Sequence, residues 1–320
     1  MPGEFDLIRR YFGRRATGVV LGAGDDCALL DVPHGHHLAV STDMLLEGRH
    51  FLPDVNPQSL GHKALAVNLS DLAAMGARPS GCLLALGLPA VDDAWLSPFS
   101  QGFHELADEA GCPLVGGDTV RSPQGVVITV SVLGSVPVGQ ALRRDAAQVG
   151  DDIWLTGSLG APGIALRLLD GRLPADDRRL TATRDALEWP GPPLAFAAEL
   201  PGRARAAIDV SDGLLQDLSH VLTASGCSAV LSFDALPVHP AIQDLPADVL
   251  KPVVLTGGDV YQLCFTAAAA HRHQLQALAR QHATPLSRIG TITGGDAGTI
   301  HDEHGHPLSL DAPGFDHFMD

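Results

Sequence analysis

The chain has 320 residues, with 21 lysines and arginines against 37 aspartates and glutamates, and a formal net charge of −16. Nucleic acids and anionic membranes bind clustered cations, and the only lysines are Lys63 and Lys251, so we expect neither partner. A chain of this length usually divides into two hydrophobic cores, so we expect two domains. Five widely spaced cysteines without a C-x-x-C pair indicate reduced thiols and a cytoplasmic protein.

The first polar turn follows a short helix expected within residues 4–12 and an apolar run at 19–21. It contains Gly24-Asp25-Asp26, and residues 27–30 continue as a strand. Glycines beside adjacent carboxylates favour a turn in which the main chain can approach a ligand. An ordinary aspartate-rich turn is the commoner explanation of this motif taken alone.

A β-branched apolar run at residues 38–40 leads into Ser41-Thr42-Asp43. We expect a buried strand that ends at these residues. The strand then delivers two hydroxyls and a carboxylate at its C-terminal end, which is where open α/β sheets place ligands.

Residues 63–77 predict a strongly apolar helix after a loop at 53–61, with Asn68 and Asp71 on one face. Neither residue lies at a helix end, so capping does not explain them. A carboxylate in the middle of an apolar helix costs several kcal/mol of desolvation unless a cation pairs with it. A metal ion is one such cation, and an arginine such as Arg78 is the alternative.

The rest of the first half predicts strands at 81–88 and 126–132, a helix at 93–110 and a linker within 137–150. The run Leu114-Val115 enters Gly116-Gly117-Asp118-Thr119, where glycines before an acid at a strand end allow close approach to phosphate. A Gly-Gly-Asp turn without a ligand is also common.

The second half repeats the pattern of an apolar run followed by acids. A short strand at 206–208 leads to Asp209-Val210-Ser211-Asp212, and the apolar run 253–255 precedes Thr256-Gly257-Gly258-Asp259. The glycines at 157, 160 and 163 between a strand and a helix fit either phosphate binding or tight packing. The remaining predicted elements are strands at 153–155, 261–265 and 287–292, helices at 162–169, 214–224 and 271–282, and a hairpin at 299–310.

Five or more aspartates in one cleft oppose folding, since two unit charges 4 Å apart repel by roughly 4 kcal/mol at an effective dielectric constant near 20. Hard divalent cations remove that penalty. Carboxylate and hydroxyl oxygens suit Mg²⁺, which commonly shares its coordination shell with substrate phosphates. An acidic, lysine-poor cleft can therefore bind a polyphosphate through magnesium.

The motifs taken together resemble those of the thiamine-monophosphate kinases, in the superfamily that includes aminoimidazole ribonucleotide synthetase. The resemblance runs in order along essentially the whole chain. The matching segments are GDDCALL (24–30), STDMLLEGRHF (41–51), KALAVNLSDLAAMGA (63–77), GGDT (116–119), IDVSDGLLQDL (208–218), LTGG (255–258) and GFDHF (314–318).

This resemblance implies an α/β (α+β) fold of two domains and an ATP-dependent phosphorylation of thiamine monophosphate to thiamine diphosphate. Residues 1–138 would form an N-terminal ATP- and magnesium-binding domain that pairs across a homodimer into a β-barrel. Residues 139–320 would form a C-terminal α/β domain that completes the nucleotide and substrate site.

The resemblance also implies residue roles. The magnesium ligands would be Asp26, Ser41, Thr42, Asp43, Asp71, Asp118, Asp209 and Asp212. ATP would contact Gly117, Asp118, Arg144 and Ser211, thiamine monophosphate would contact His50, Asp259 and Phe315, and Asp25 would stand beside the metal set. No nucleophile or general base is expected, because a phosphate monoester is already mostly dianionic at pH 7.

The sequence departs from the family pattern at two places, both of which include residues expected to contact the acceptor, thiamine monophosphate. The usual Gly-Gly-Glu-Asp-Tyr-Glu-Leu reads Gly-Gly-Asp-Val-Tyr-Gln-Leu at 257–263, and phenylalanine stands at 315 where tyrosine is frequent. We expect a weakened or altered affinity for thiamine monophosphate, and a Michaelis constant that does not change when the acids at 259, 260 and 262 are restored would contradict this.

The rival readings are another ATP-dependent synthetase of the superfamily and a non-catalytic ATP and magnesium sensor. A selenophosphate-type enzyme is expected to contain a reactive cysteine and lysine before Cys27, and a hydrogenase-maturation relative is expected to contain a C-terminal cysteine. Neither feature is present in the sequence.

Overall fold

The computed structural model describes residues 7–14, 17–22 and 27–308. The chain forms two compact units, Met1–Leu72 with Ala77–Gly139, and Ala73–Gly76 with Gln140–Asp320. Each unit combines a β-sheet with helices, so the predicted α/β class is confirmed. None of the described helices is long and apolar enough to span a membrane.

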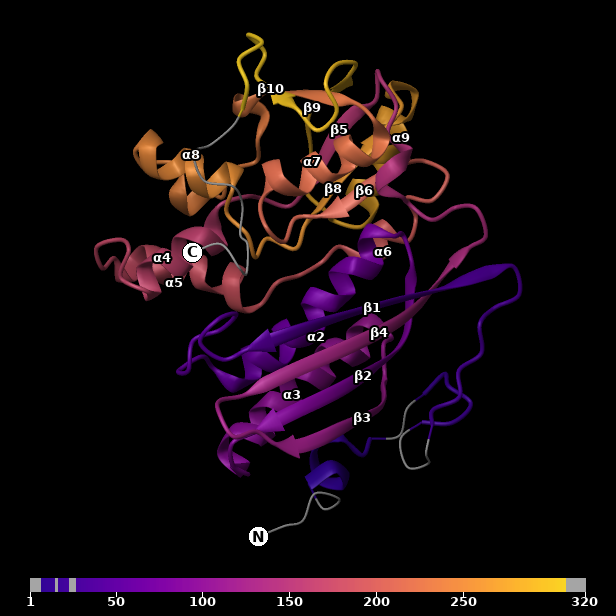
Figure 1. Ribbon diagram of the computed structural model, residues 1–320, viewed down its shortest axis with the longest axis vertical. Helices are drawn as coiled ribbons and strands as arrows, with labels where there is room; N and C mark the ends of the chain where they lie inside the picture. Colours follow the sequence, from indigo (N-terminus) through magenta and orange to yellow (C-terminus); the bar gives the residue numbers. More distant parts are fainter. Residues whose placement is uncertain (1–6, 15–16, 23–26, 309–320) are drawn as a thin grey trace. The chain divides into compact units, whose positions relative to one another are not determined.

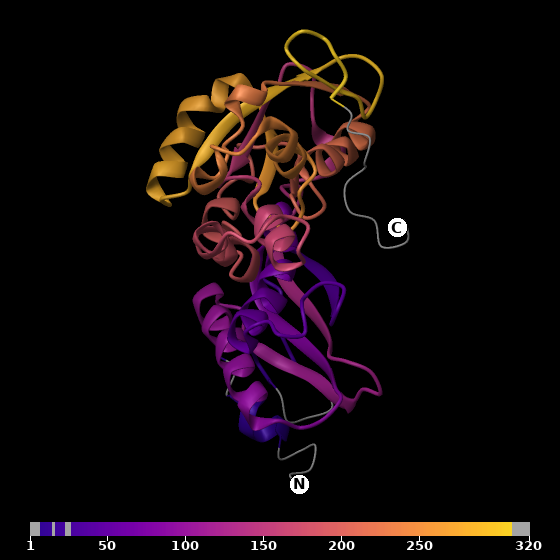
Figure 2. The ribbon, with the colours of Figure 1, turned by 90° about the vertical axis from the view of Figure 1, so that its left-hand side faces the viewer.

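The N-terminal unit is a four-stranded sheet covered on one face by two helices, as the edge-on view in Figure 2 shows. The strand order is β1-β4-β2-β3, with β2 and β3 parallel and the other neighbours antiparallel. The elements are η1 (Ile8–Phe12), β1 (His36–Leu46), α2 (Pro57–Ala74), β2 (Arg78–Leu88), α3 (Asp93–Ala110), β3 (Leu114–Arg121) and β4 (Val127–Pro137).

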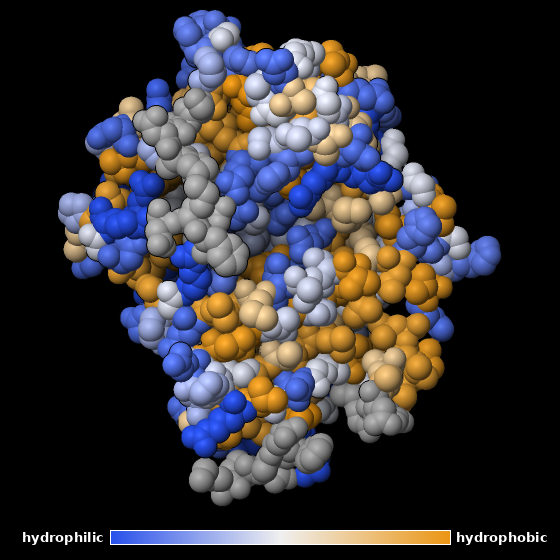
Figure 3. Space-filling model, viewed as in Figure 1, coloured by the Kyte–Doolittle hydropathy of each residue, from blue (hydrophilic) through white to orange (hydrophobic). Residues whose placement is uncertain are grey.

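Strand β4 shows how the two faces of this sheet differ. Its residues alternate between buried and half-buried along its whole length, because successive side chains point to opposite faces. The buried set, which includes Ile128, Val130 and Val132, packs on the helix side. The other face, turned to the viewer in Figures 1 and 3, carries large exposed apolar side chains, namely Leu38, Val40, Met44, Leu46, Leu83 and Val120.

Strand β1 differs from the expectation that it is buried and ends at Ser41. It continues to Leu46, so Ser41, Thr42 and Asp43 lie in the middle of an edge strand paired with β4. The segment Gly116–Thr119 likewise lies within β3 and not after it. Polar residues inside a strand resemble a strand end when only the local sequence is read.

Other helices and strands of the N-terminal unit also begin or end at residues that differ from the predicted ones. Helix α2 begins at Pro57, inside the segment expected to be a loop, because proline is well accommodated in the first turn of a helix. The expected strands at 19–21 and 27–30 reduce to one bridge between Leu21 and Leu29. The predicted helix at 93–110 coincides with α3, which Asp92 caps by accepting from the Ala94 N–H at 2.9 Å.

The C-terminal unit is built on a six-stranded sheet of order β10-β7-β9-β5-β8-β6 (Figure 1). Its strands are β5 (Asp152–Thr156), β6 (Ala207–Asp209), β7 (Ser228–Leu231), β8 (Leu263–Ala267), β9 (Leu286–Thr293) and β10 (Ile300–His301). Its helices are η2 (Arg144–Ala146), α4 (Ala161–Leu169), α5 (Asp177–Glu188), α6 (Leu194–Ala197), α7 (Leu214–Ser225), η3 (Phe233–Ala235), η4 (Pro240–Ile242), α8 (Ala247–Leu255), η5 (Ala269–His271) and α9 (Arg272–Gln281).

Both faces of this second sheet are covered. In β5, Ile153 and Leu155 join the cluster around α7 and α8, whereas Trp154 between them joins the cluster around Phe196 and Phe265. All five residues of β5 are therefore buried, as is typical of a strand with helices on both sides.

Several elements of this unit were not predicted, among them β7, α5 and α8. The run 253–255 is the end of helix α8, since a short apolar run does not distinguish a strand from a buried helix. Helix α5 had no predicted counterpart. The expected hairpin at 299–310 is present in its described part, because His301 and Pro307 form an antiparallel bridge, and β10 also pairs in parallel with β7.

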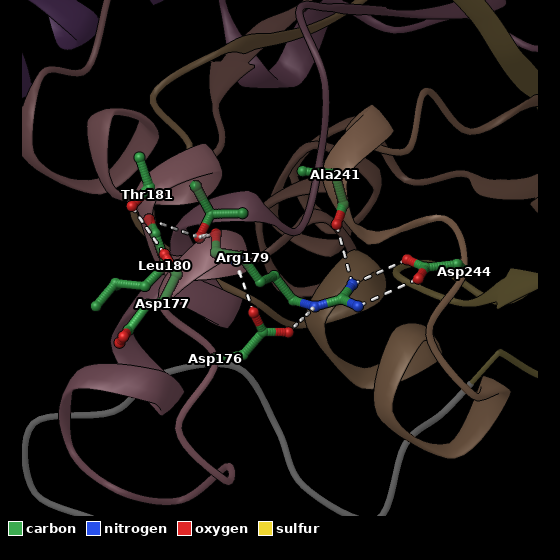
Figure 4. Close-up of polar contacts among 8 residues, drawn as sticks. Asp176, Asp177, Arg179, Leu180, Thr181, Ala241 and Asp244 are labelled. Atoms are coloured by element: carbon green, nitrogen blue, oxygen red, sulfur yellow. Dashed lines mark hydrogen bonds and ion pairs between the residues drawn. The ribbon is translucent and has the colours of Figure 1, made fainter.

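Arg179 fixes helix α5 to η4 and to the segment that follows it (Figure 4). The guanidinium donates to Asp244 at 2.9 and 3.2 Å and to the Ala241 carbonyl at 3.0 Å. Asp176 caps the helix by accepting from the Arg179 N–H at 2.9 Å. The Asp244 carboxylate raises the pKa of Arg179, and the guanidinium lowers the pKa of Asp244 in turn.

Candidate functional site

The N-terminal unit brings Ser41, Asp43 and Asp71 together between β1 and α2. The Ser41 hydroxyl donates to Asp71 Oδ2 at 2.5 Å, so Ser41 faces the helix. Asp43 lies two residues further along the strand and therefore points to the same side. The mid-helix position of Asp71 is explained by this contact, because its carboxylate accepts from a residue of the strand.

Asn68 fixes this arrangement, although it was not among the predicted ligands. The side chain is fully buried, and its Oδ1 accepts from the main-chain N–H of Asp43 at 2.9 Å. Its Nδ2 donates to the Ala64 carbonyl at 3.0 Å. An edge strand has main-chain groups without a strand partner, and Asn68 satisfies one of them from the helix. Its place on the Asp71 face was the sequence signal for this role.

Thr42 and Asp118 lie on the opposite face of the same sheet. The Thr42 hydroxyl donates to the Val130 carbonyl at 3.1 Å and accepts from Ser131 Oγ at 2.9 Å. Asp118 is in register with Ala85 on β2 and is exposed, like Val120 on the same face. Strand β3 is three strands away from β1, roughly 14 Å at the usual spacing. Within one chain, the sheet therefore separates Asp118 from Asp43 and Asp71.

Gly117 is required by packing within the sheet. A Cβ at this residue would lie 1.9 Å from the Leu84 carbonyl oxygen, and its φ is 154°. The close approach that the sequence predicted for phosphate is made here by the neighbouring strand β2.

His50 lies in the turn that follows β1. Its Nδ1 accepts from the main-chain N–H of Leu46 at 3.0 Å. A nitrogen that accepts carries no proton, so the neutral ring is protonated at Nε2. The turn thus fixes both the orientation and the tautomer of the residue predicted to contact thiamine monophosphate.

In the C-terminal unit the acids follow strand β6, as predicted. Asp209 is its last residue and is buried, and Ser211 and Asp212 come before helix α7. This is the end of the strand at which α/β sheets place ligands.

Asp217 holds the turn after β6 and was missed by the sequence reading. One carboxylate oxygen accepts from the N–H groups of Ser211, Asp212 and Gly213 at 3.0, 3.1 and 3.0 Å. Burial, followed by the charges of Asp212 and Asp209, raises the pKa of Asp217 to about 7. An acid in the first turn of a helix was the available signal.

The segment 257–262 folds back on this turn. The N–H of Asp259 donates to the Ser211 carbonyl and that of Tyr261 to the Val210 carbonyl, both at 2.8 Å. Asp259 and Tyr261 have φ values of 60° and 51°, which residues other than glycine adopt rarely. Tyr261 Oη donates to Asp259 Oδ1 at 3.1 Å. The predicted substrate residue Asp259 is therefore held in a strained turn beside Ser211.

Packing accounts for two of the three glycines after β5. A Cβ on Gly160 would lie 2.7 Å from Ile242 Cδ1 and one on Gly157 would lie 2.6 Å from Gln262, whereas one on Gly163 would make ordinary contacts with Val253. Arg144, predicted to contact ATP, is exposed at the start of η2, where its carbonyl accepts from Ser225 Oγ at 2.7 Å. The predicted site residues Asp25, Asp26 and Phe315 lie outside the described residues.

The donor set fits magnesium shared with a ligand. Asp43 and Asp71 supply carboxylate oxygens on one side of β1, and Mg²⁺ is usually bound through one or two carboxylates together with substrate phosphates. Among the described residues, no three His, Cys, Asp or Glu side chains form a group that could hold a metal ion by themselves.

Comparisons with known proteins agree with these motifs. The family described as "AIR synthase related protein, N-terminal domain" matches residues 24–136, and the corresponding C-terminal domain matches residues 148–303. The thiamine-monophosphate kinase of Escherichia coli (strain K12) is 42% identical over 322 residues, which covers 99% of this chain and 98% of that protein. The chain belongs to the thiamine-monophosphate kinase family.

Solved structures of this family share the fold. The thiamine-monophosphate kinase from Stenotrophomonas maltophilia K279a has a TM-score of 0.85 at 42% identity, over 94% of this chain and 95% of that one. A structure described as "AaThiL complexed with AMPPCP and TMP" has a TM-score of 0.77 at 25% identity, over 98% and 96%. The hydrogenase maturation protein HypE, in complex with ATP, has a TM-score of 0.79 at 22% identity and shows the fold alone.

Proposed function

We propose that this chain transfers the γ-phosphoryl group of ATP to the phosphate of thiamine monophosphate, giving thiamine diphosphate and ADP. The observation that carries this proposal is 42% identity along the full chain to an enzyme named for that activity. The arrangement of Ser41, Asp71 and the turn after β6 supports it, because these residues match the family motifs.

The proposed roles follow the family motifs. Magnesium is bound by Asp26, Ser41, Thr42, Asp43, Asp71, Asp118, Asp209 and Asp212, with Asp25 beside them. Gly117, Asp118, Arg144 and Ser211 contact ATP, whereas His50, Asp259 and Phe315 contact thiamine monophosphate. When bound, Mg²⁺ neutralises the phosphate charges and aligns the reacting groups.

The acceptor needs no general base. Its phosphate oxygen is ionised near pH 7, so the new P–O bond forms without removal of a proton, and the bond to the β-phosphate oxygen of ADP breaks. His50, protonated at Nε2 when neutral, can donate a hydrogen bond to the substrate. Incubation with γ-labelled ATP should leave no phosphorylated protein, and a trapped phosphoenzyme would contradict direct in-line transfer.

We further propose a homodimer, supported by the face of the N-terminal sheet opposite α2 and α3. That face exposes six large apolar side chains, and exposed apolar patches of this kind mark interaction surfaces. Asp118 lies on the same face, so an Asp118 that binds the ions held by Asp43 and Asp71 must come from a second copy. The cytoplasmic location predicted from the reduced cysteines belongs to the same proposal.

Mixing two variants tests the shared site. Asp71→Asn and Asp118→Asn should each be inactive alone, whereas a mixture refolded in equal amounts should recover up to about a quarter of the activity, because each mixed dimer keeps one intact site. No recovery, with dimers present by light scattering, would show that both acids act within one chain.

The decisive assay measures ADP release together with the phosphorylated product. We expect turnover with thiamine monophosphate and none with thiamine or with aminoimidazole ribonucleotide precursors. Binding of Mg-ATP without ADP release on addition of thiamine monophosphate would instead support the sensor. Turnover with an aminoimidazole precursor would support the related synthetase.

A further inference from the structure

The side-chain amide of Gln262 links three segments of the C-terminal unit. Its Oε1 accepts from the Thr156 hydroxyl at 2.8 Å, and its Nε2 donates to the Gly191 carbonyl at 3.0 Å. Thr156 is the last residue of β5, and Gly191 lies in residues 189–193 between α5 and α6. Gln262 thus ties the connection between two helices to the central sheet.

The direction of these bonds is fixed by Thr156. Its Oγ1 also accepts from the Leu263 N–H at 2.9 Å, and the residue is fully buried. Its single proton therefore goes to Gln262 Oε1, which leaves the NH₂ group of the amide to satisfy the Gly191 carbonyl. A glutamate at 262 could still accept from Thr156, but an ionised carboxylate has no proton to give to Gly191.

Gly157 provides the space for this amide. A Cβ on Gly157 would lie 2.6 Å from Cδ and Oε1 of Gln262. The residue also has a φ of 64°, which suits glycine. The Gln262 amide is therefore held by hydrogen bonds to Thr156 and Gly191 and packs against Gly157, where no side chain fits.

The link lies in the same turn as Asp259. The main chain of Gln262 accepts from the Val210 N–H at 2.8 Å, while the N–H of Asp259 donates to Ser211. We propose that Gln262 is a positioning residue of the acceptor site, which acts by holding residues 189–193 beside the Asp259 turn. This inference rests on the proposed function, since Asp259 is a substrate residue only if thiamine monophosphate is the acceptor.

The family pattern makes Gln262→Glu the informative variant, because glutamate usually stands at this position. At pH 8 the ionised glutamate faces the Gly191 carbonyl, so we expect KM for thiamine monophosphate to rise about tenfold, with kcat and KM for ATP changed less than about twofold. The variant to wild-type ratio of KM should shrink as pH falls, because a protonated carboxylic acid can donate again. Gln276→Glu, which adds the same charge on the exposed side of α9, should change neither value.

Trp189 gives a second measurement that does not depend on turnover. Trp189 is 36% exposed, whereas Trp154 is 2% exposed and Trp95 is half-buried, so comparison with Trp189→Phe isolates the part of the acrylamide quenching that comes from residue 189. Gln262→Glu should raise the quenching at pH 8 and less so at pH 5.5. If wild-type protein does not phosphorylate thiamine monophosphate, the proposed function fails, but the quenching still decides whether Gln262 holds the segment.

Gln262→Met covers the case in which the charged variant does not fold. It has no proton to donate and no charge, so KM should rise by a similar factor at every pH. A KM ratio for Gln262→Glu that does not vary with pH, or quenching equal to that of the wild type, overturns the proposal. Thermal unfolding of each variant shows that the compared proteins are folded.

Discussion

In the N-terminal unit, Asp43 and Asp71 stand on a strand and a helix, and buried side chains hold them in place. In the C-terminal unit, Asp212 and Asp259 stand in turns, and main-chain bonds to Asp217 and to the Ser211 carbonyl hold them. The first group is fixed by packing of regular elements, and the second by hydrogen bonds of turn backbone, which is strained at Asp259. We therefore expect the first to tolerate little change and the second to allow variation, as the altered 257–263 segment already shows.

The largest expected effect is on Asp71. Asp71→Asn keeps an oxygen that can accept from Ser41 but removes a charge, so we expect kcat to fall by about 100- to 1000-fold without a change in the unfolding midpoint. Steady-state kinetics with thiamine monophosphate measures this. Asp54→Asn, on the exposed turn before α2, is the matched control. Near-normal activity of Asp71→Asn would show that Asp71 is not a magnesium ligand.

The next effect is on stability in the C-terminal unit. Val260 is 6% exposed within the apolar cluster around α7 and α8, so Val260→Asp buries an unpaired carboxylate and should cost several kcal/mol of unfolding free energy. Asp259→Glu, at a half-buried position, should cost little. Denaturant titration measures both. A variant that carries all three acids of the family pattern is therefore expected to be unstable. Normal stability of Val260→Asp would show that residue 260 is not buried.

Asn68 should show a smaller effect that combines stability and metal binding. Asn68→Leu leaves the Asp43 N–H without its side-chain partner and removes the additional bond to the Ala64 carbonyl, so we expect a loss of about 1–3 kcal/mol and a severalfold weaker affinity for Mg-ATP. Asn56→Ala, which removes the cap at the start of α2, should cost about 1 kcal/mol without weakening Mg-ATP binding. Equal affinities for the two variants, measured by calorimetry, would argue against the role of Asn68.

The smallest expected effect concerns two residues with strained backbone, Ala283 and Asp259. Ala283, with a φ of 49°, lies far along the chain from the site residues, and Ala283→Gly should stabilise the protein by up to about 1 kcal/mol with KM unchanged. Asp259→Gly relieves similar strain but loses the bond from Tyr261, so it should gain less stability and raise KM for thiamine monophosphate. If both variants change KM equally, the strain at residue 259 has no particular part in substrate binding.

The sequence by itself determined the family, the α/β class, helix α3 and the acids after β6. These features depend largely on local patterns: Asp92 caps its own helix, and the apolar run before Asp209 was correctly predicted as a strand, although the similar run at 253–255 is helical. It did not reveal α5, because most residues of this helix are polar and only Leu180 and Leu187 are large and apolar.

Only the tertiary structure decided which acids share a face. Whether a strand ends at Ser41 or runs on to Leu46 depends on its pairing with β4, a partner about 90 residues away. That pairing places Ser41 and Asp43 against α2, and the register of β2 with β3 places Asp118 on the other side of the sheet. Side chains of a strand alternate between faces, so long-range register and not local composition determines which carboxylates can meet.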